Sequence, residues 1–180
     1  MKHIVAAVLV GLTLTALPAK EAAASMAIPT TIAQVAHQKG VPPDIFYAVL
    51  LNETKIKTNM QRVVAWPWSA NWQGRSYRFK TRSELYQFCQ GLLDKGYESF
   101  DIGISQVNWK WHKHRFNNLW AATDPWVNMH AAADYLLEHY QTERNWLIAA
   151  GKYHAPNHPA NAKKYRNGVL AQWKKIKGRS

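Results

Sequence analysis

The chain has 180 residues, 47% of them hydrophobic, and a formal net charge of +12 at pH 7. This length and apolar content fit one globular domain with a sizeable core and leave no room for a second. The only cysteine, Cys89, excludes an internal disulfide, and the positive charge favours a polyanionic partner.

Residues 1–24 have the pattern of an export signal. A basic start precedes an apolar run at residues 4–17, and small residues follow at positions 22–24. The run is too short to cross a bilayer, so a signal peptide is favoured over a membrane anchor. We expect cleavage near Ala24, with residues 25–180 forming one exported domain without a membrane span, in the periplasm or at the cell wall.

The positive charge of the chain predicts a different binding partner in each cellular compartment. A basic, aromatic-rich protein suggests nucleic acid in the cytoplasm, whereas the carboxylates of the bacterial wall attract such a surface outside it. Because residues 1–24 predict export, the wall is the expected partner and nucleic acid is not.

Two helices are predicted at the start of the mature chain. Residues 29–31 supply an N-cap for a short amphipathic helix, and Gly40 is placed to end it. Two prolines at positions 42–43, followed by an acid, suit the first turn of a second helix that runs to about Lys55.

The segment 56–79 changes character and predicts a loop with a small hairpin. Its tryptophans Trp66 and Trp68 are candidates for stacking on sugars or nucleobases, because aromatic side chains in loops often have this role. Packing is instead the favoured role of four tryptophans in helical contexts, namely Trp120, Trp126, Trp146 and Trp173.

The rest of the chain is predicted to be helical. A capping residue at 81–83 opens one helix, and the Asp-Pro pair at 124–125 opens another. Two further helices, at 146–152 and 159–175, flank a turn at 153–157. The chain is therefore expected to be mainly α-helical.

The second predicted helix ends in a carboxylate. Glu53 shares a helical face with four apolar residues, Ile45, Phe46, Val49 and Leu50. Burial on such a face raises a carboxyl pKa, which lets a general acid keep its proton near neutral pH. The alternative is that the apolar stripe fades into solvent at the helix end and leaves Glu53 an ordinary surface acid. Spacing alone does not decide between the two.

Other kinds of chemistry have weaker support in the sequence. His112 and His114 lack a third ligand at a familiar spacing and lie in a basic segment, so no metal is expected. Neither Ser105 nor Cys89 lies in a recognisable nucleophile motif, which disfavours hydrolysis by a triad. No cofactor is expected.

The order of these segments resembles the soluble lytic transglycosylase (SLT) family. An apolar helix ends in Glu53, a Gly-x-x-Gln segment follows at 103–106, and an Asp-Pro helix precedes a tyrosine turn. The resemblance extends from Pro29 to about Trp173. It implies a mainly α, lysozyme-like fold of the goose-type lysozyme/SLT kind, with a small β-hairpin or loop insertion.

Three motifs carry the resemblance. Residues 48–54 (AVLLNET) look like the end of the family's catalytic helix, where the glutamate is followed by serine. Residues 101–108 (DIGISQVN) are similar to the family's Gly-Leu-Met-Gln-Ile segment, and residues 150–156 (AGKYHAP) to its Ala-Tyr-Asn-x-Gly turn. By resemblance Glu53 is catalytic, and the substrate-binding candidates are Gln106, Tyr153, Gly103, Ser105 and His154.

The resemblance also implies a mechanism. In the family one carboxyl protonates the oxygen between N-acetylmuramic acid (MurNAc) and N-acetylglucosamine (GlcNAc), and then accepts the proton of the muramoyl C6 hydroxyl to leave a 1,6-anhydro product. The family tyrosine, matched by Tyr153, lies near that acid, and His154 replaces the usual asparagine. Residues 65–68 and the Tyr-His turn resemble smaller members associated with conjugation, secretion or pilus machines, which open the wall locally.

Three rival functions stay open at this point. The chain is a hydrolytic lysozyme if water attacks instead, with Asp101 as the second carboxylate. It is a peptidoglycan-binding assembly component without turnover if the altered turn at His154 disables catalysis. A nucleic-acid-binding protein is the third alternative, suggested by charge and aromatic content.

Overall fold

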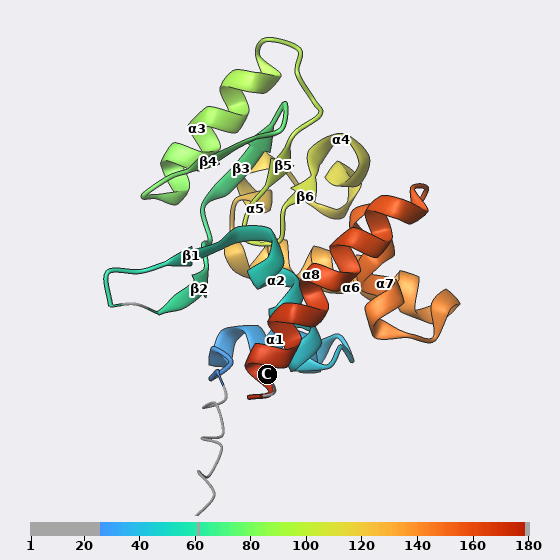
Figure 1. The fold of residues 1–180 in the computed structure, drawn as a ribbon. Coiled ribbons are helices and arrows are strands. Elements are labelled where there is room, and N and C mark those ends of the chain that lie inside the picture. The colour runs from blue at the N-terminus through green and yellow to red at the C-terminus, as the bar shows by residue number, and fades with distance from the viewer. Residues whose placement is uncertain (1–25, 61, 179–180) are drawn as a thin grey trace, which may run out of the picture.

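The computed structural model describes residues 26–60 and 62–178, and the predicted signal peptide at residues 1–24 lies outside them. Helices predominate in the described part, and short antiparallel strands form a lobe beside them (Figure 1). The predicted mainly α class is confirmed. None of the helices in the described ranges is long and apolar enough to cross a membrane.

The helical body is built around α2 (Pro43–Thr54). Every side chain from Ile45 to Leu51 is buried, so this helix is apolar on all sides and other helices must enclose it. The helices that contact it are α1 (Thr30–Gln38), α7 (Trp146–His154) and α8 (Pro159–Ile176), while α6 (Pro125–Glu143) packs against α1 and α7. The predicted bounds of the second helix are confirmed.

The β-lobe is larger than the predicted single hairpin. One antiparallel pair consists of β1 (Lys55–Lys57) and β2 (Val63–Ala65). A four-stranded antiparallel sheet has the order β4-β3-β5-β6, with β3 (Ser69–Trp72), β4 (Arg75–Arg78), β5 (Asp101–Ile102) and β6 (Val107–Asn108). This sheet brings Asp101, from a segment distant in sequence, beside the hairpin.

Aromatic packing joins the β3–β4 hairpin to the helix that follows it. Helix α3 (Arg82–Leu93) packs Phe88 against Tyr77 and Phe79 of the hairpin, with ring centroids 4.6 and 5.2 Å away. Three short helices follow β6, namely α4 (Trp109–His112), the 3-10 helix η1 (Lys113–Arg115) and α5 (Leu119–Ala122). Trp66 donates its indole N–H to the Phe79 carbonyl at 2.9 Å, so this tryptophan also holds the hairpin.

Predicted helix starts are confirmed where a side-chain cap exists. Thr81 accepts the backbone N–H of Glu84, and Asp124 accepts those of the first residues of α6. The predicted cap of α1 is wrong, since Thr30 is already helical and no side chain caps that end. Gly40 follows α1 with φ +68°, as a residue that ends a helix should.

The predicted turn at 153–157 begins too early. Helix α7 extends to His154, and the Ala155 N–H still bonds to the Gly151 carbonyl at 3.1 Å. Both Tyr153 and His154 therefore lie in the last helical turn, because the first proline after them comes only at position 156.

The packing predicted for four tryptophans is only partly right. Trp146 stacks on Tyr140 with 3.7 Å between ring centroids, and Trp173 donates its indole N–H to Asp44 at 3.0 Å. Trp120 and Trp126, in contrast, are 45% and 37% exposed. Both lie near the start of a helix, where one side of the ring stays outside the core.

Candidate active site

Glu53 lies in the last turn of α2, at the junction with the β-lobe. Its carboxyl accepts a hydrogen bond of 2.6 Å from the Tyr165 hydroxyl of α8. Glu53 is partly buried and Tyr165 is 8% exposed. The interpretation of Glu53 as an ordinary surface acid is therefore excluded, although the residue as a whole keeps some access to solvent.

The surroundings of Glu53 favour its protonated form. Burial raises the pKa of Glu53 to about 8, the hydrogen bond from Tyr165 opposes that rise, and the nearby charge of Asp101 adds to it. A carboxyl with this pKa holds its proton at neutral pH and can lose it during a reaction, which is the property of a residue that acts first as acid and then as base.

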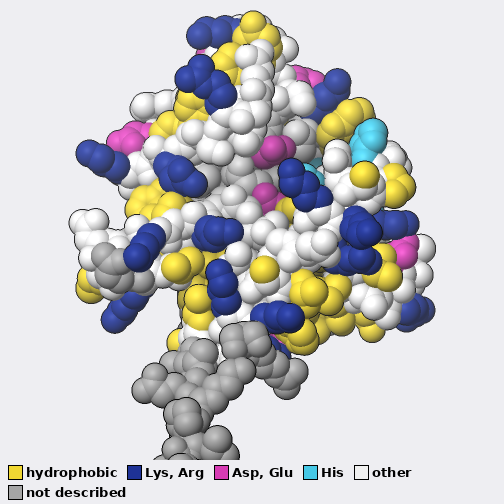
Figure 2. All heavy atoms as spheres, in the orientation of Figure 1, with side chains coloured by type: hydrophobic (Ala, Val, Ile, Leu, Met, Phe, Trp, Pro, Cys, Tyr) yellow, Lys and Arg dark blue, Asp and Glu magenta, His cyan; other side chains and the backbone are white. Residues whose placement is uncertain are grey.

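Asp101 is the second carboxylate of the site. It lies in β5, partly buried, and accepts a 2.8 Å hydrogen bond from the Asn108 side-chain amide. Burial raises the pKa of Asp101 while the Asn108 hydrogen bond lowers it. Figure 2 shows acidic side chains in a hollow near the middle of one face, with Lys and Arg side chains around it.

Gly103 shapes the loop that follows β5. Its φ is +82°, its N–H bonds to the Ser69 carbonyl at 2.8 Å, and a Cβ at this position would lie 2.5 Å from the Asn128 side chain. Asn128 in turn donates to the Ile102 and Ala122 carbonyls at 3.0 and 3.1 Å. No residue with a Cβ fits here, so the fold requires glycine at position 103 whether or not a ligand binds.

We predict that Gly103→Ala strongly destabilises the protein. The methyl group would meet Asn128 in a backbone conformation that alanine disfavours, at an expected cost of about 2–4 kcal/mol. Gly91→Ala is the matched control, because Gly91 lies in α3 with no neighbour within 4 Å of the added methyl group. Urea unfolding of both variants measures the difference, and equal stability of the two would contradict this account of the loop.

The same loop is tied to α2 and α7. The Tyr153 hydroxyl donates to the Ser105 carbonyl at 2.7 Å, and the Thr54 hydroxyl donates to the Ile104 carbonyl at 3.0 Å. Ser105 is fully buried, and its N–H bonds to Asn128 at 3.0 Å. Thr54 thus fixes the loop to the helix that carries Glu53, and Tyr153 fixes it to α7. A direct contact of Ser105 with a substrate has no support.

Gln106 and His154 are the predicted binding residues that solvent reaches. Gln106, with φ +49°, is partly exposed and bonds through its amide N–H to the Gly103 carbonyl at 2.9 Å. The exposed His154 ring stacks on Tyr165, with centroids 4.5 Å apart and planes 7° from parallel. His154 therefore covers the tyrosine that bonds to Glu53.

Tyr165 and Asn128 are the site residues that the sequence analysis missed. Tyr165 lies on the buried face of α8 with Val169 and Ile176, so its spacing indicates only a core position. The hydrogen bond to Glu53 comes from Tyr165 rather than from Tyr153. Burial raises the pKa of the Tyr153 hydroxyl, and the charge of nearby Glu53 raises it further.

The remaining sequence candidates lie outside this arrangement. Among the described residues, no group of three or more His, Cys, Asp or Glu side chains is placed to hold a metal ion. The rings of His112 and His114 are 6.3 Å apart, and burial together with nearby Arg115 lowers the pKa of His112 to about 4. Cys89 is fully buried, and burial raises its pKa to about 12, which keeps the thiol protonated and inert.

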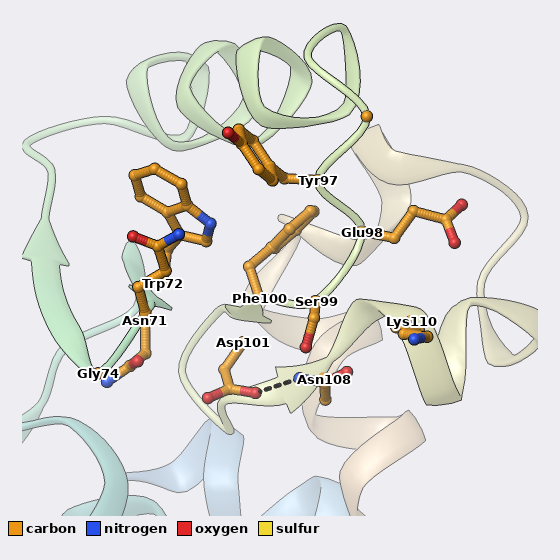
Figure 3. A pocket seen from close by; sticks show the side chains of 12 residues that line it. Asn71, Trp72, Gly74, Tyr97, Glu98, Ser99, Phe100, Asp101, Asn108 and Lys110 are labelled. Atoms are coloured by element: carbon orange, nitrogen blue, oxygen red, sulfur yellow. Dashed lines mark hydrogen bonds between the residues drawn. The ribbon is translucent and has the colours of Figure 1, made fainter.

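The two loop tryptophans that the sequence proposed for stacking on a ligand pack against each other instead. The rings of Trp66 and Trp68 pack edge to face, with centroids 6.1 Å apart, and both are partly buried. An open groove of about 590 Å³ begins instead at Asp101 and runs past Trp72 and Tyr97 (Figure 3).

Comparisons with protein-family models, with curated proteins and with solved structures gave no match to this chain.

Proposed function

We propose that this chain is an exported, lysozyme-like lytic transglycosylase that cleaves the β-1,4 bond between MurNAc and GlcNAc in peptidoglycan. The environment of Glu53 carries the proposal: a partly buried carboxyl with a pKa of about 8 that accepts a hydrogen bond from Tyr165. The order of Glu53, the Gly103 to Gln106 segment and Tyr153 along the chain supports it, as does the net charge of +12, which suits the wall.

In the first step Glu53 acts as the acid. Its proton goes to the glycosidic oxygen, the bond from that oxygen to the muramoyl C1 breaks, and the departing GlcNAc gains a hydroxyl. The carboxylate left behind is stabilised by the Tyr165 hydroxyl, which already lies 2.6 Å from Oε1.

In the second step Glu53 acts as the base. The muramoyl C6 oxygen attacks C1, its proton returns to Glu53, and the product is 1,6-anhydro-MurNAc. No water is consumed and the enzyme is restored, so one carboxyl is sufficient. Thr54 and Tyr153 hold the loop against α2 and α7, and the exposed part of Gln106 is available to the sugar.

The expected partners are the glycan strands. A conjugation, secretion or pilus machine that needs a local opening in the wall is proposed as the cellular context, by resemblance alone. No metal or cofactor takes part in the proposed steps.

A hydrolytic lysozyme is the second candidate function, because Asp101 lies close enough for its charge to raise the pKa of Glu53. A carboxylate that activates water gives a product with a reducing end rather than an anhydro end. A wall-binding component without turnover is the third.

Digestion of purified peptidoglycan, followed by mass spectrometry of the released sugars, separates these functions. Anhydro-muropeptides support the transglycosylase, and reducing ends support the lysozyme. Binding of intact peptidoglycan without any released sugar would contradict both enzymes and leave the assembly component.

A further inference from the structure

The ring of His154 lies flat against that of Tyr165, the residue that bonds to Glu53. The two centroids are 4.5 Å apart and the planes are 7° from parallel, while the Tyr165 hydroxyl donates to Glu53 at 2.6 Å. His154 is exposed, whereas Tyr165 is only 8% exposed. The imidazole is therefore the outer ring of the stack, and it separates one face of the phenol ring from water.

Two glycines allow the helices that carry these rings to approach their neighbours closely. A Cβ at Gly151 of α7 would lie 2.8 Å from a backbone oxygen of α8, and a Cβ at Gly168 of α8 would lie 2.5 Å from a side chain of α2. His154 lies three residues after Gly151, and Tyr165 lies three residues before Gly168. Each ring is thus about one helical turn from a tight contact, so the backbone that carries it is held in place.

With the backbone held, side-chain rotation is the motion that can break the bond between Tyr165 and Glu53. Rotation about χ1 would swing the Tyr165 hydroxyl away, and a ring packed flat against the phenol blocks that rotation on one side. Burial raises the pKa of Tyr165 well above its ordinary value, and the charge of Glu53 raises it further. The hydroxyl therefore keeps its proton and stays a hydrogen-bond donor.

The stacked imidazole acts through its shape rather than through a charge. Burial lowers the pKa of His154, so its ring is neutral at pH 7 and above. Two other ionisable groups act on this pair: the charge of Asp101 from β5 raises the pKa of Glu53, and that of Tyr153 from α7 raises the pKa of Tyr165. Because the imidazole is uncharged, another flat ring should be able to replace it.

We propose that His154 is a positioning residue, whose ring holds the Tyr165 hydroxyl against Glu53. This role needs no contact between the imidazole and a sugar, and so it differs from the substrate contact that the resemblance implies for position 154. The arrangement of the rings exists without a substrate, but its consequence for catalysis rests on the function proposed above.

The test follows the titration of Glu53 in the protein without substrate, by NMR of a carbon-13 label in its side-chain carboxyl. The hydrogen bond from Tyr165 lowers the pKa of Glu53, so His154→Ala should move the midpoint to higher pH, as Tyr165→Phe does. In the Tyr165→Phe background, His154→Ala should cause no further shift, because the hydroxyl that it positions is gone. The rate of muropeptide release should fall about threefold in His154→Ala, less than in Tyr165→Phe.

His154→Phe, which keeps a flat ring, should restore the parent midpoint. His37→Ala is the matched control, since His37 is also an exposed histidine in the last turn of a nine-residue helix, and it should leave the midpoint unchanged. Circular dichroism confirms that each variant is folded.

Three results would overturn the positioning role. The first is a midpoint that His154→Ala leaves unchanged. The second is a shift to lower pH, which would mean that the imidazole only keeps water from Glu53. The third is an equal shift with and without the Tyr165 hydroxyl. Because the titration needs no substrate, a lack of released sugar from the unsubstituted protein would contradict the proposed function and leave the positioning role standing.

Discussion

Glu53→Gln is expected to lower the rate of sugar release from peptidoglycan about a hundred- to ten-thousandfold, the usual contribution of a general acid and base. Glutamine has nearly the same shape and still accepts the Tyr165 hydrogen bond, but it has no proton to give to the glycosidic oxygen. The rate of release of soluble muropeptides, measured by chromatography, checks this prediction.

The matched control is Glu138→Gln, which removes an exposed carboxylate that pairs with Arg115 on the surface. This variant should keep the parent rate. A Glu53→Gln protein as active as Glu138→Gln would remove Glu53 from the mechanism.

Glu53→Gln is also expected to stabilise the fold at alkaline pH. The folded pKa of Glu53 is about 8, above its ordinary value of 4.5, so folding retains a proton that the unfolded chain loses between these values. Stability from this group is therefore fully present below about pH 4.5 and is lost as the pH rises to about 8.

The size of this effect is measurable by thermal unfolding. At pH 8 Glu53→Gln should be about 3 kcal/mol more stable than the parent, an amount reduced for the partial exposure of Glu53. At pH 4 the two proteins should unfold alike. A difference that does not change between the two pH values would contradict the raised pKa.

Tyr165→Phe is expected to move the alkaline limb of the pH–rate profile to higher pH. The Tyr165 hydroxyl lowers the pKa of Glu53, so its loss raises that pKa further and keeps Glu53 protonated to higher pH. The maximal rate should fall about tenfold, because the carboxylate formed in the first step loses its hydrogen-bond donor.

Tyr153→Phe provides the comparison for this prediction. Its hydroxyl bonds to the Ser105 carbonyl rather than to Glu53, so its removal should lower stability and leave the alkaline limb nearly in place. Equal shifts of the limb in both variants would contradict the distinct roles of Tyr165 and Tyr153. The pH dependence of kcat/KM, measured on a soluble glycan fragment, gives the answer.

The local signals of the sequence predicted the helices well. Pro43 and the Asp124–Pro125 pair begin α2 and α6 as expected, and the apolar run before Glu53 is fully enclosed. The helix starts depend on neighbouring residues alone, whereas the enclosure of the apolar run also needs α1, α7 and α8. The predicted N-cap of α1 failed because Pro29 occupies the N-cap position, so Thr30 is already the first helical residue and cannot act as the cap.

The contacts around Glu53 required the folded chain. Tyr165 is 112 residues from Glu53 in sequence, and its position on α8 is that of any core residue. Strands β5 and β6 have only two residues each, too few for an alternating pattern, so the sheet that places Asp101 near Glu53 gave no sequence signal. The structural role of Gly103 also gave no sequence signal, because the side chain that excludes a Cβ there belongs to Asn128 on α6.

We propose that Glu53 alone breaks the glycan strand without water, and digestion of peptidoglycan in water enriched in oxygen-18 distinguishes this from attack by water. Mass spectrometry then reads the oxygen at the new muramoyl end. We expect 1,6-anhydro ends that carry no heavy oxygen and that are absent after treatment with Glu53→Gln. Heavy oxygen at a reducing muramoyl C1 would contradict it, and would assign the attack to water with Asp101 as the nearest second carboxylate.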